Sequence, residues 1–304
     1  MLHVDRAVKR YGSFTAVNGV SFKAEPGRIF GLLGPNGAGK TSTIRMITHI
    51  TVPDKGAVTL DGEPVGPASQ RRMGYLPEER GLYKKMKVGE QLIYLAQLKG
   101  MARADAARTT RDWLGRLGLG DQWGAEVEAL SKGMQQKVQF VATIAHAPDL
   151  LILDEPFSGL DPINADLLRD IIQELRAAGR IILFASHRLE QVEKLCDDVC
   201  LIARGQVVLS GVLSEVKRRF GSNTLTLRFD GPDAWLDTLA TEGVIEIESR
   251  SRGAAEVLLA DAVPARRILE AALSAGADVA HFERHEPPLS VIYKLAVEQG
   301  SVGV

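Results

Sequence analysis

The sequence predicts an α/β protein of 304 residues with a second, smaller α+β domain at its C-terminal end. Three observations carry this prediction. The apolar run IFGLLG leads through a Gly-rich loop into KTSTIRMITHI, which has helical character, and this is the strand–loop–helix start of an α/β unit. Apolar runs of strand length return after residue 150. Beyond residue 223, strand and helix patterns alternate again over a separate stretch.

The first 146 residues contain strands followed by helices. Residues 1–30 predict strands, because apolar and polar residues mix in short runs that end at Gly or Pro-Gly. Residues 84–146 predict helices, because apolar residues recur three to four positions apart in VGEQLIYLAQLKG and in two later stretches. Between them, GYLPEERGLY at residues 74–83 is punctuated by Gly and Pro and predicts a loop.

The stretch after residue 150 has clear element boundaries. LLILDEP and IILFAS predict buried parallel strands, and CLIARGQVVLSG predicts a hairpin. Between the two strands, Asp161 is a helix N-cap candidate, Pro162 suits the first helical position and Gly179 follows the last. The apolar residues expected on one face of this helix are Ile163, Leu167, Ile171 and Leu175.

The C-terminal stretch forms a pattern of its own. Its elements follow the order β-α-β-β-α-β-α, and the first six match a ferredoxin-like order. A boundary is predicted near Phe220 to Asn223. We therefore expect one domain at residues 1–220, with a helical subdomain at about 84–146, and an accessory domain at 221–304.

Composition excludes several classes of protein. A net charge of -1 and a sequence pI near 6.6 give no electrostatic reason to expect nucleic-acid binding. Cys196 and Cys200 are too few for a disulfide framework or a four-thiolate zinc site, so we expect small buried hydrophobic side chains in a reduced, cytosolic protein. The N-terminus has no apolar core of a secretory signal. The longest apolar runs fall far short of the ~18–20 residues that span a bilayer.

GPNGAGKT, from Gly34 to Thr41, fits the phosphate-binding loop known as the P-loop. The glycines let successive backbone N–H groups face phosphate oxygens, and the following helix adds its positive end. Lys40 supplies a cation to the β- and γ-phosphates, and the Thr41 hydroxyl can ligate Mg²⁺. An accidental Gly-rich turn is disfavoured by the strand predicted before the loop and the helix predicted after it.

Two adjacent acids end the apolar run LLILDEP. A P-loop needs a second strand that brings a carboxylate to the metal, and Asp154 stands where such a strand would end. Glu155 follows at once and can position or deprotonate an attacking water. An ordinary strand-to-loop Asp is the simpler interpretation, but the P-loop in the same chain favours the chemical one.

These motifs together resemble the nucleotide-binding subunit of ABC transporters over nearly all of residues 1–220. The resemblance implies a P-loop NTPase, an ABC ATPase core with an antiparallel β subdomain and a helical subdomain. In it, LSKGMQQK at residues 130–137 is the signature, SGLD at 158–161 is the D-loop, His187 is the switch histidine and Tyr11 stacks on adenine. Ser131 could be only a helix cap and Tyr11 only a packing residue; the other motifs favour the functional roles.

The resemblance implies an ATPase that binds ATP and Mg²⁺. The catalytic residues expected from it are Glu155, His187 and Lys40. The metal ligands expected from it are Thr41, Asp154 and Glu78. The residues expected to contact ATP are Tyr11, Gly34, Pro35, Asn36, Gly37, Ala38, Gly39, Lys40, Thr41, Ser42, Glu78, Ser131, Gly133 and Asp154.

The resemblance also implies partners. Two such subunits, most simply a homodimer, close head to tail around two ATPs, each site combining one chain's P-loop with the other's signature. The chain has one of each, so the membrane permeases are separate chains. GPNGAGKTSTIRMIT and the C-terminal extension are similar to the exporter branch that pairs with type-2 permeases, including sodium- and drug-export subunits. The expected location is the cytoplasmic face of the cell membrane, with membrane contact only through the permease.

Three other kinds of ABC protein are alternatives. Ribosome-associated ABC ATPases usually carry two modules joined by a charged linker, and this chain has neither. Those of DNA repair or chromosome structure interrupt the module with a long coiled coil, but here the stretch between the P-loop and the signature is too short and lacks sustained heptads. A regulator that binds ATP without hydrolysis is disfavoured by Glu155 and His187. The exported substrate is not predicted, because it is selected by the permease.

One residue departs from the family pattern. GYLPEERGLY corresponds to the Q-loop, in which a Gln usually ligates Mg²⁺, and this chain has Glu78 in that place. A carboxylate also binds a hard cation, but without metal it repels phosphate. Our hypothesis is that Glu78 stays close to the metal and makes closure more dependent on Mg²⁺. The alternative is that the loop has lost its metal contact and only couples the subdomains.

Overall fold

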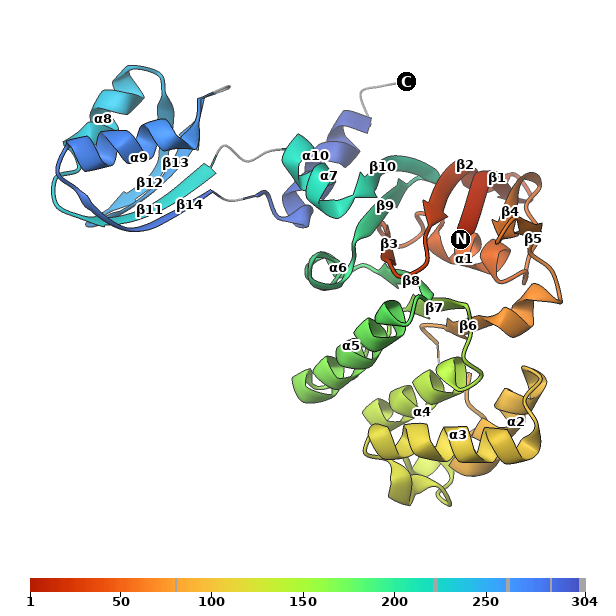
Figure 1. Ribbon diagram of the computed structural model, residues 1–304. Coiled ribbons are helices and arrows are strands. Elements are labelled where there is room, and N and C mark those ends of the chain that lie inside the picture. Colours follow the sequence, from red (N-terminus) through yellow and green to blue (C-terminus); the bar gives the residue numbers. More distant parts are fainter. Residues whose placement is uncertain (80, 221–223, 261–262, 285, 301–304) are drawn as a thin grey trace. The chain divides into compact units, whose positions relative to one another are not determined.

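The structure is a computed structural model that describes residues 1–79, 81–220, 224–260, 263–284 and 286–300 (Figure 1). The chain divides into two compact units. Unit 1 comprises Met1–Leu213 with Ala296–Val304, and unit 2 comprises Ser214–Leu295. Residues 221–223 of the expected domain boundary lie outside the described residues, so the division into 1–220 and 221–304 stays a prediction.

Unit 1 contains two sheets. The first is antiparallel, with strand order β2-β1-β4-β5, and the second has the order β10-β9-β3-β8-β7-β6. The strands of the first sheet are β1 (Leu2–Tyr11), β2 (Phe14–Ala24), β4 (Lys55–Leu60) and β5 (Glu63–Pro64). The strands of the second are β3 (Ile29–Leu33), β6 (Met73–Leu76), β7 (Leu150–Asp154), β8 (Ile181–Ser186), β9 (Asp198–Ala203) and β10 (Gln206–Val212).

The second sheet determines where the functional loops lie. Its strands from β9 to β6 are parallel, and β10 pairs antiparallel with β9 in the expected hairpin. Every residue of β3, β7 and β8 is buried, as their apolar sequences predict. Because parallel strands end at the same edge of a sheet, the loops after these three strands lie side by side.

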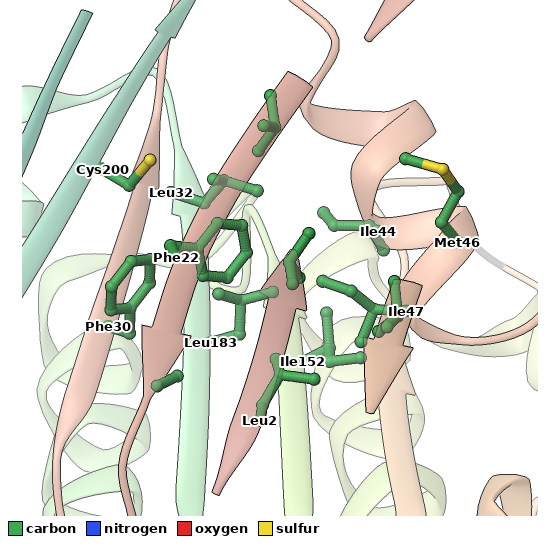
Figure 2. Packing of buried hydrophobic residues seen from close by; sticks show 14 of the residues in the cluster. Leu2, Phe22, Phe30, Leu32, Ile44, Met46, Ile47, Ile152, Leu183 and Cys200 are labelled. Atoms are coloured by element: carbon green, nitrogen blue, oxygen red, sulfur yellow. The ribbon is translucent and has the colours of Figure 1, made fainter. Parts of the chain in front are cut away.

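The core of unit 1 lies between the two sheets and helix α1 (Figure 2). Phe22 of β2 stacks on Phe30 of β3, with 4.8 Å between the ring centroids. Leu2 of β1 faces Ile152 of β7 in the same cluster, and Ile44 of α1 is fully buried beside them. Cys200 belongs to this core, and both cysteines are free and buried, which confirms that they are small buried side chains.

The helices of unit 1 fall into two groups. Helices α2, α3 and α4 lie together, and α4 packs against β6 at the edge of the second sheet (Figure 1). The helices are α1 (Lys40–Ile47), α2 (Val88–Leu98), α3 (Arg103–Arg116), α4 (Lys132–Ile144), α5 (Pro162–Ala177) and α6 (Leu189–Leu195), with short 3₁₀ turns η1 (Ser69–Arg72), η2 (Gly120–Gln122) and η3 (Val127–Ala129). No helix in the described part of the chain is long and apolar enough to cross a bilayer.

Helix α5 confirms its predicted ends but not its whole apolar face. The Asp161 side chain caps it by accepting a hydrogen bond from Asn164 N, and Pro162 is the first helical residue. Gly179 follows the helix with φ of 79°. Ile163, however, is 81% exposed. The buried face consists of Leu168, Ile171 and Ile172.

The expected loop at residues 74–83 is partly wrong. Strand β6 continues to Leu76, where it pairs with Leu153 of β7, so the loop begins only at Pro77. The Gly at position 74 does not break the strand because it packs closely: a Cβ there would lie 2.3 Å from Thr143 O.

Unit 2 has the ferredoxin-like order that the sequence predicts. Its four-stranded sheet is antiparallel, with order β12-β13-β11-β14, and α8 and α9 connect the outer strands to the inner ones. Leu227, Trp235 and Ile268 are among the residues of its own core. Its elements are β11 (Thr224–Asp230), α8 (Ala234–Thr241), β12 (Ile245–Ser251), β13 (Ala254–Leu259), α9 (Ala265–Ser274) and β14 (Asp278–Arg284), preceded by α7 (Leu213–Arg219) and followed by α10 (Leu289–Gly300).

Candidate functional site

The loop from Gly34 to Gly39 is shaped by close packing. A Cβ on Gly34 would lie 2.2 Å from the carbonyl oxygen of Ile202, and one on Gly39 would lie 2.5 Å from that of Ala16. Both glycines have positive φ, 149° and 108°. Only glycine fits such positions, and this turn conformation is the kind in which backbone N–H groups can face an anion, although Ala38 N already donates to Pro35 O at 3.1 Å. Helix α1 begins directly after it and has no acid in its first turn.

Lys40 stands at the start of α1 with its ammonium turned back onto the loop. Its Nζ donates hydrogen bonds to Gly34 O at 2.6 Å and Pro35 O at 3.1 Å. Burial lowers the pKa of this ammonium, while Asp154, Glu155 and Glu78 act in the opposite direction. An ammonium has three donors, so one remains available to a phosphate oxygen.

Three carboxylates face this cation. Asp154 ends β7, Glu155 follows it, and Glu78 comes from the loop after β6. Burial, with the negative charges of Glu78 and Glu155, raises the pKa of Asp154 to about 6. A cation placed among these carboxylates would oppose that shift.

Glu155 is held tightly by the end of β8. Its Oε1 accepts hydrogen bonds from His187 N at 2.6 Å and from His187 Nδ1 at 2.7 Å. Its Oε2 accepts one from Ser186 Oγ at 3.1 Å. The bond from the ring requires the Nδ1 atom of His187 to carry the hydrogen, which leaves its other nitrogen free to contact a ligand.

These groups line one cavity of about 380 Å³. Tyr11 and Phe14 expose their rings at one part of its wall, with 43% and 63% of their surfaces accessible. Gly34 and Pro35, also expected to contact ATP, are not among the lining residues; their carbonyl oxygens accept hydrogen bonds from Lys40, which does line the cavity. The full lining is Tyr11, Phe14, Ala16, Asn36, Gly37, Ala38, Gly39, Lys40, Thr41, Ser42, Glu78, Asp154, Glu155 and His187.

The cavity suits a nucleotide accompanied by a metal better than a resident metal. Among the described residues, no three His, Cys, Asp or Glu side chains form a metal-binding group by themselves. Mg²⁺ is usually held by one or two carboxylates together with substrate phosphates. Thr41, Asp154 and Glu78 beside the phosphate loop fit that arrangement.

Ser131 and Gly133 are not among the residues that line the cavity. The Ser131 side chain caps α4 by accepting a hydrogen bond from Met134 N at 3.3 Å. A Cβ on Gly133 would lie 3.2 Å from the carbonyl oxygen of Gly159, so this helix start is packed against the 158–161 loop. The start of α4 has no acid in its first turn and its dipole favours an anion.

A sequence model of a family described as "ABC transporter" matches residues 17–158. The uncharacterized ABC transporter ATP-binding protein YhaQ of Bacillus subtilis (strain 168) is 42% identical over 96% of this chain and 97% of its own length. The chain belongs to the ABC transporter ATP-binding family. A second family model, described as "ATP-binding protein DrrA1-3-like, C-terminal domain", matches residues 211–297 of this ABC protein.

Two further comparisons agree that this protein belongs to the ABC transporter ATP-binding family. The Nod factor export ATP-binding protein I of Paraburkholderia xenovorans (strain LB400) is 35% identical over 79% of this chain and 80% of its own length. A solved structure described as "Structure of ATP binding subunit of ABC transporter" is 32% identical, with a TM-score of 0.69 over 72% of this chain and 93% of that one. The predicted fold, ATP binding and ATPase activity are thereby confirmed.

The sequence alone missed two features of this ABC ATPase. Phe14 lines the cavity together with Tyr11. The stretch YGSF, in which the two aromatic residues flank one turn, could have predicted that Phe14 lies near Tyr11. Ser186 had no signal, because a Ser at the end of an apolar strand is ordinary and only the structure brings it to Glu155.

A second hollow, of about 330 Å³, lies beside the loop that carries Glu78. Its wall includes Leu82, Leu95 and Leu98, and the neighbouring Tyr83 and Tyr94 rings meet edge to face at 6.4 Å. Tyr83, Tyr94 and Leu98 are 57%, 42% and 59% exposed. The remaining lining residues are Gly74, Tyr75, Pro77, Gly81, Lys99, Gln139, Ala142, Thr143 and His146.

Proposed function

We propose that this ABC ATPase is the motor subunit of an export transporter, working as a homodimer on separate permease subunits at the cytoplasmic face of the membrane. One observation carries the proposal. The P-loop, the acids and His187 share one cavity, whereas Ser131 and Gly133 of the signature do not line it. A second copy would supply the missing helix start to the γ-phosphate, so that ATP itself closes the dimer.

In this proposal each part of the cavity has one task. Tyr11 and Phe14 offer rings for the adenine, and the loop N–H groups with Lys40 hold the phosphates. Mg²⁺, when bound with ATP, supplies a counter-charge to the phosphates, and Thr41, Asp154 and Glu78 would hold it. Glu155 accepts the proton of the attacking water.

His187 has two functions in this arrangement. It orients Glu155 through its backbone N–H and its Nδ1, at 2.6 and 2.7 Å. Its other ring nitrogen can donate to a phosphate oxygen when it also carries a hydrogen, which is the imidazolium form of His187. The His187 side chain is 56% exposed and lines the cavity.

Glu78 belongs to the same proposal. It lines the cavity with Thr41 and Asp154, and its charge raises the pKa of Asp154. The loop that carries it is tied to α4, because Gln139 Nε2 lies 3.4 Å from both Pro77 O and Glu79 O. A metal-proximal Glu78 would therefore connect the nucleotide site to the helical subdomain.

The export direction and the permease partner have separate support. A relative is named for Nod factor export, and the C-terminal match describes a DrrA-like domain. The hollow beside the Glu78 loop has Leu98 in its wall, and the exposed Tyr83 and Tyr94 adjoin its lining residues Leu82 and Leu95 in the chain; together they offer an apolar surface for a permease segment. We also propose that residues 1–220 form the motor domain and residues 221–304 an accessory domain.

The substitution Glu155→Gln tests the mechanism. We expect it to preserve ATP affinity, to abolish turnover and to accumulate an ATP-bound dimer, because the amide is a poor base of nearly the same shape. Steady-state ATPase assays and light scattering with ATP measure these effects. Hydrolysis at the wild-type rate would show that the base lies elsewhere.

The partner is tested by affinity purification of the full chain from its own membranes. We expect a co-purifying integral membrane protein, and we expect Tyr94→Glu together with Leu98→Glu to release it while ATP binding is retained. Arg103→Glu, at the start of α3, serves as a charge-matched surface control. A chain that comes free of any membrane protein would contradict the permease proposal.

A further inference from the structure

Ser186 is a buried hydroxyl directly behind the reaction centre. It is the last residue of β8, is 0% exposed and is not among the residues that line the cavity. Its neighbour in the sheet is Leu33, the residue before the phosphate loop. No role follows for it from phosphate binding, because its hydroxyl does not reach the cavity surface.

The hydrogen bonds of Ser186 have a fixed direction. Its Oγ accepts from Arg188 N at 3.0 Å, because a backbone N–H can only donate. The single hydroxyl hydrogen is then directed to Glu155 Oε2 at 3.1 Å, because an ionised carboxylate can only accept. Ser186 is itself closed to solvent, so this hydroxyl is the donor that the protein supplies to Oε2.

The backbone of Glu155 makes this support necessary. Glu155 has φ of 50°, in the left-handed region that non-glycine residues rarely adopt. Its N–H donates to Ala185 O at 2.9 Å, and its two carboxylate oxygens receive donors from Ser186 and His187. Three successive residues at the end of β8 therefore fix both the backbone and the side chain of Glu155.

We propose that Ser186 is a positioning residue for ATP hydrolysis: its hydroxyl fixes the plane of the Glu155 carboxylate through Oε2, while His187 fixes Oε1. The inference rests on the role as base proposed for Glu155. Without the Ser186 hydroxyl, only Oε1 is held, so the carboxylate can rotate about that oxygen. It then loses the orientation in which it accepts a proton from the attacking water. A hydroxyl at position 186 thus raises the rate of turnover and does not contribute to nucleotide binding.

The experiment compares four full-length variants by steady-state ATPase assays. We expect Ser186→Ala and the volume-matched Ser186→Cys to lower kcat about 10- to 100-fold, the range for loss of one hydrogen bond to a charged group, with KM for ATP within about twofold. Ser186→Thr keeps a hydroxyl, so we expect it to retain kcat within about threefold. Thr110→Val removes another fully buried hydroxyl, bonded to Ala106 O in α3, and should leave kcat unchanged.

A purely structural role for Ser186 gives a different result. It would lower ATP affinity together with kcat, and it would do so in the Glu155→Gln background as well. We expect equilibrium ATP affinity to be the same in Glu155→Gln with and without Ser186→Ala. A weaker affinity in the double variant, or a wild-type kcat in Ser186→Ala, overturns the positioning role.

The two proposals fail in different ways. Wild-type hydrolysis by Glu155→Gln would overturn the base and this inference together. An inactive Glu155→Gln with a fully active Ser186→Ala would overturn only this inference.

Discussion

His146 makes the stability of unit 1 depend on pH. It follows α4 and its Nε2 lies 3.1 Å from Met73 O, a pairing that requires the hydrogen on Nε2 and leaves Nδ1 as an acceptor. Nδ1 is buried without a partner among the described residues. Burial, assisted by the positive charge of Lys99, lowers the pKa of His146 from 6.5 to about 4.

The sign of the effect follows from which state takes up the proton first. As the pH falls from 6.5 to about 4, the unfolded chain is protonated at this residue while the folded chain is not. The contribution of His146 to stability is therefore intact above pH 6.5 and is lost progressively down to about pH 4. The full loss would be about 3 kcal/mol, and partial access of solvent to the ring reduces our expectation to about 2 kcal/mol.

Urea unfolding measures this loss. In a Trp235→Phe background, the fluorescence of Trp113 and Trp123 reports on unit 1 alone, because these are the other tryptophans of the chain. We expect the free energy of unfolding of this Trp235→Phe parent to fall between pH 7.5 and pH 5. The fall should be about 1–2 kcal/mol larger in the parent than in the parent that also carries His146→Gln.

The effect of His146 must be taken from the difference between the parent and His146→Gln, because other groups also change the stability over this pH range. Asp154 titrates in the same range with the opposite sign, because its raised pKa lets the folded state bind the proton first. His281→Gln, at an exposed histidine of unit 2, should leave the pH dependence of the parent unchanged. Equal pH dependence in the parent and in His146→Gln would refute the reasoning.

Three further predictions concern the P-loop, the Glu78 loop and helix packing. Lys40→Ala should abolish detectable ATP binding by equilibrium dialysis, because the phosphates lose their cation, and unchanged affinity would contradict that role. Glu78→Gln should alter the Mg²⁺ concentration that half-saturates ATPase activity, and identical titrations would favour a loop without metal contact. Gly89→Ala should lower the free energy of unfolding of unit 1 by about 1–3 kcal/mol, because the new Cβ would lie 2.3 Å from Trp123 Cε2. Gly115→Ala, in helix α3 with open space around it, should raise that free energy by about 0.5–1 kcal/mol. If urea unfolding shows that both substitutions change the free energy in the same direction, the packing argument is refuted.

Short sequence patterns correctly predicted those features whose residues are adjacent in the chain. The P-loop, the Asp161 cap and the strand before Asp154 each depend on neighbours within about one turn or one strand, so residue order specifies them. The same reasoning was wrong where tertiary packing determined whether a residue is buried or in which element it lies. Ile163 fits the apolar period of α5 but lies exposed at its first turn, and Gly74 lies within a strand because Thr143 packs against it.

The sequence by itself determined the chemistry of this protein: a phosphate loop, a cation and an acidic pair, each at the end of an apolar strand. Only the tertiary structure decided which partners hold those groups. Glu155 and Ser186 are 31 positions apart, and the hydrogen bond between them exists because β7 and β8 pair in one register. Strand register and side-chain direction depend on contacts distant in the chain, and no short stretch of sequence contains them.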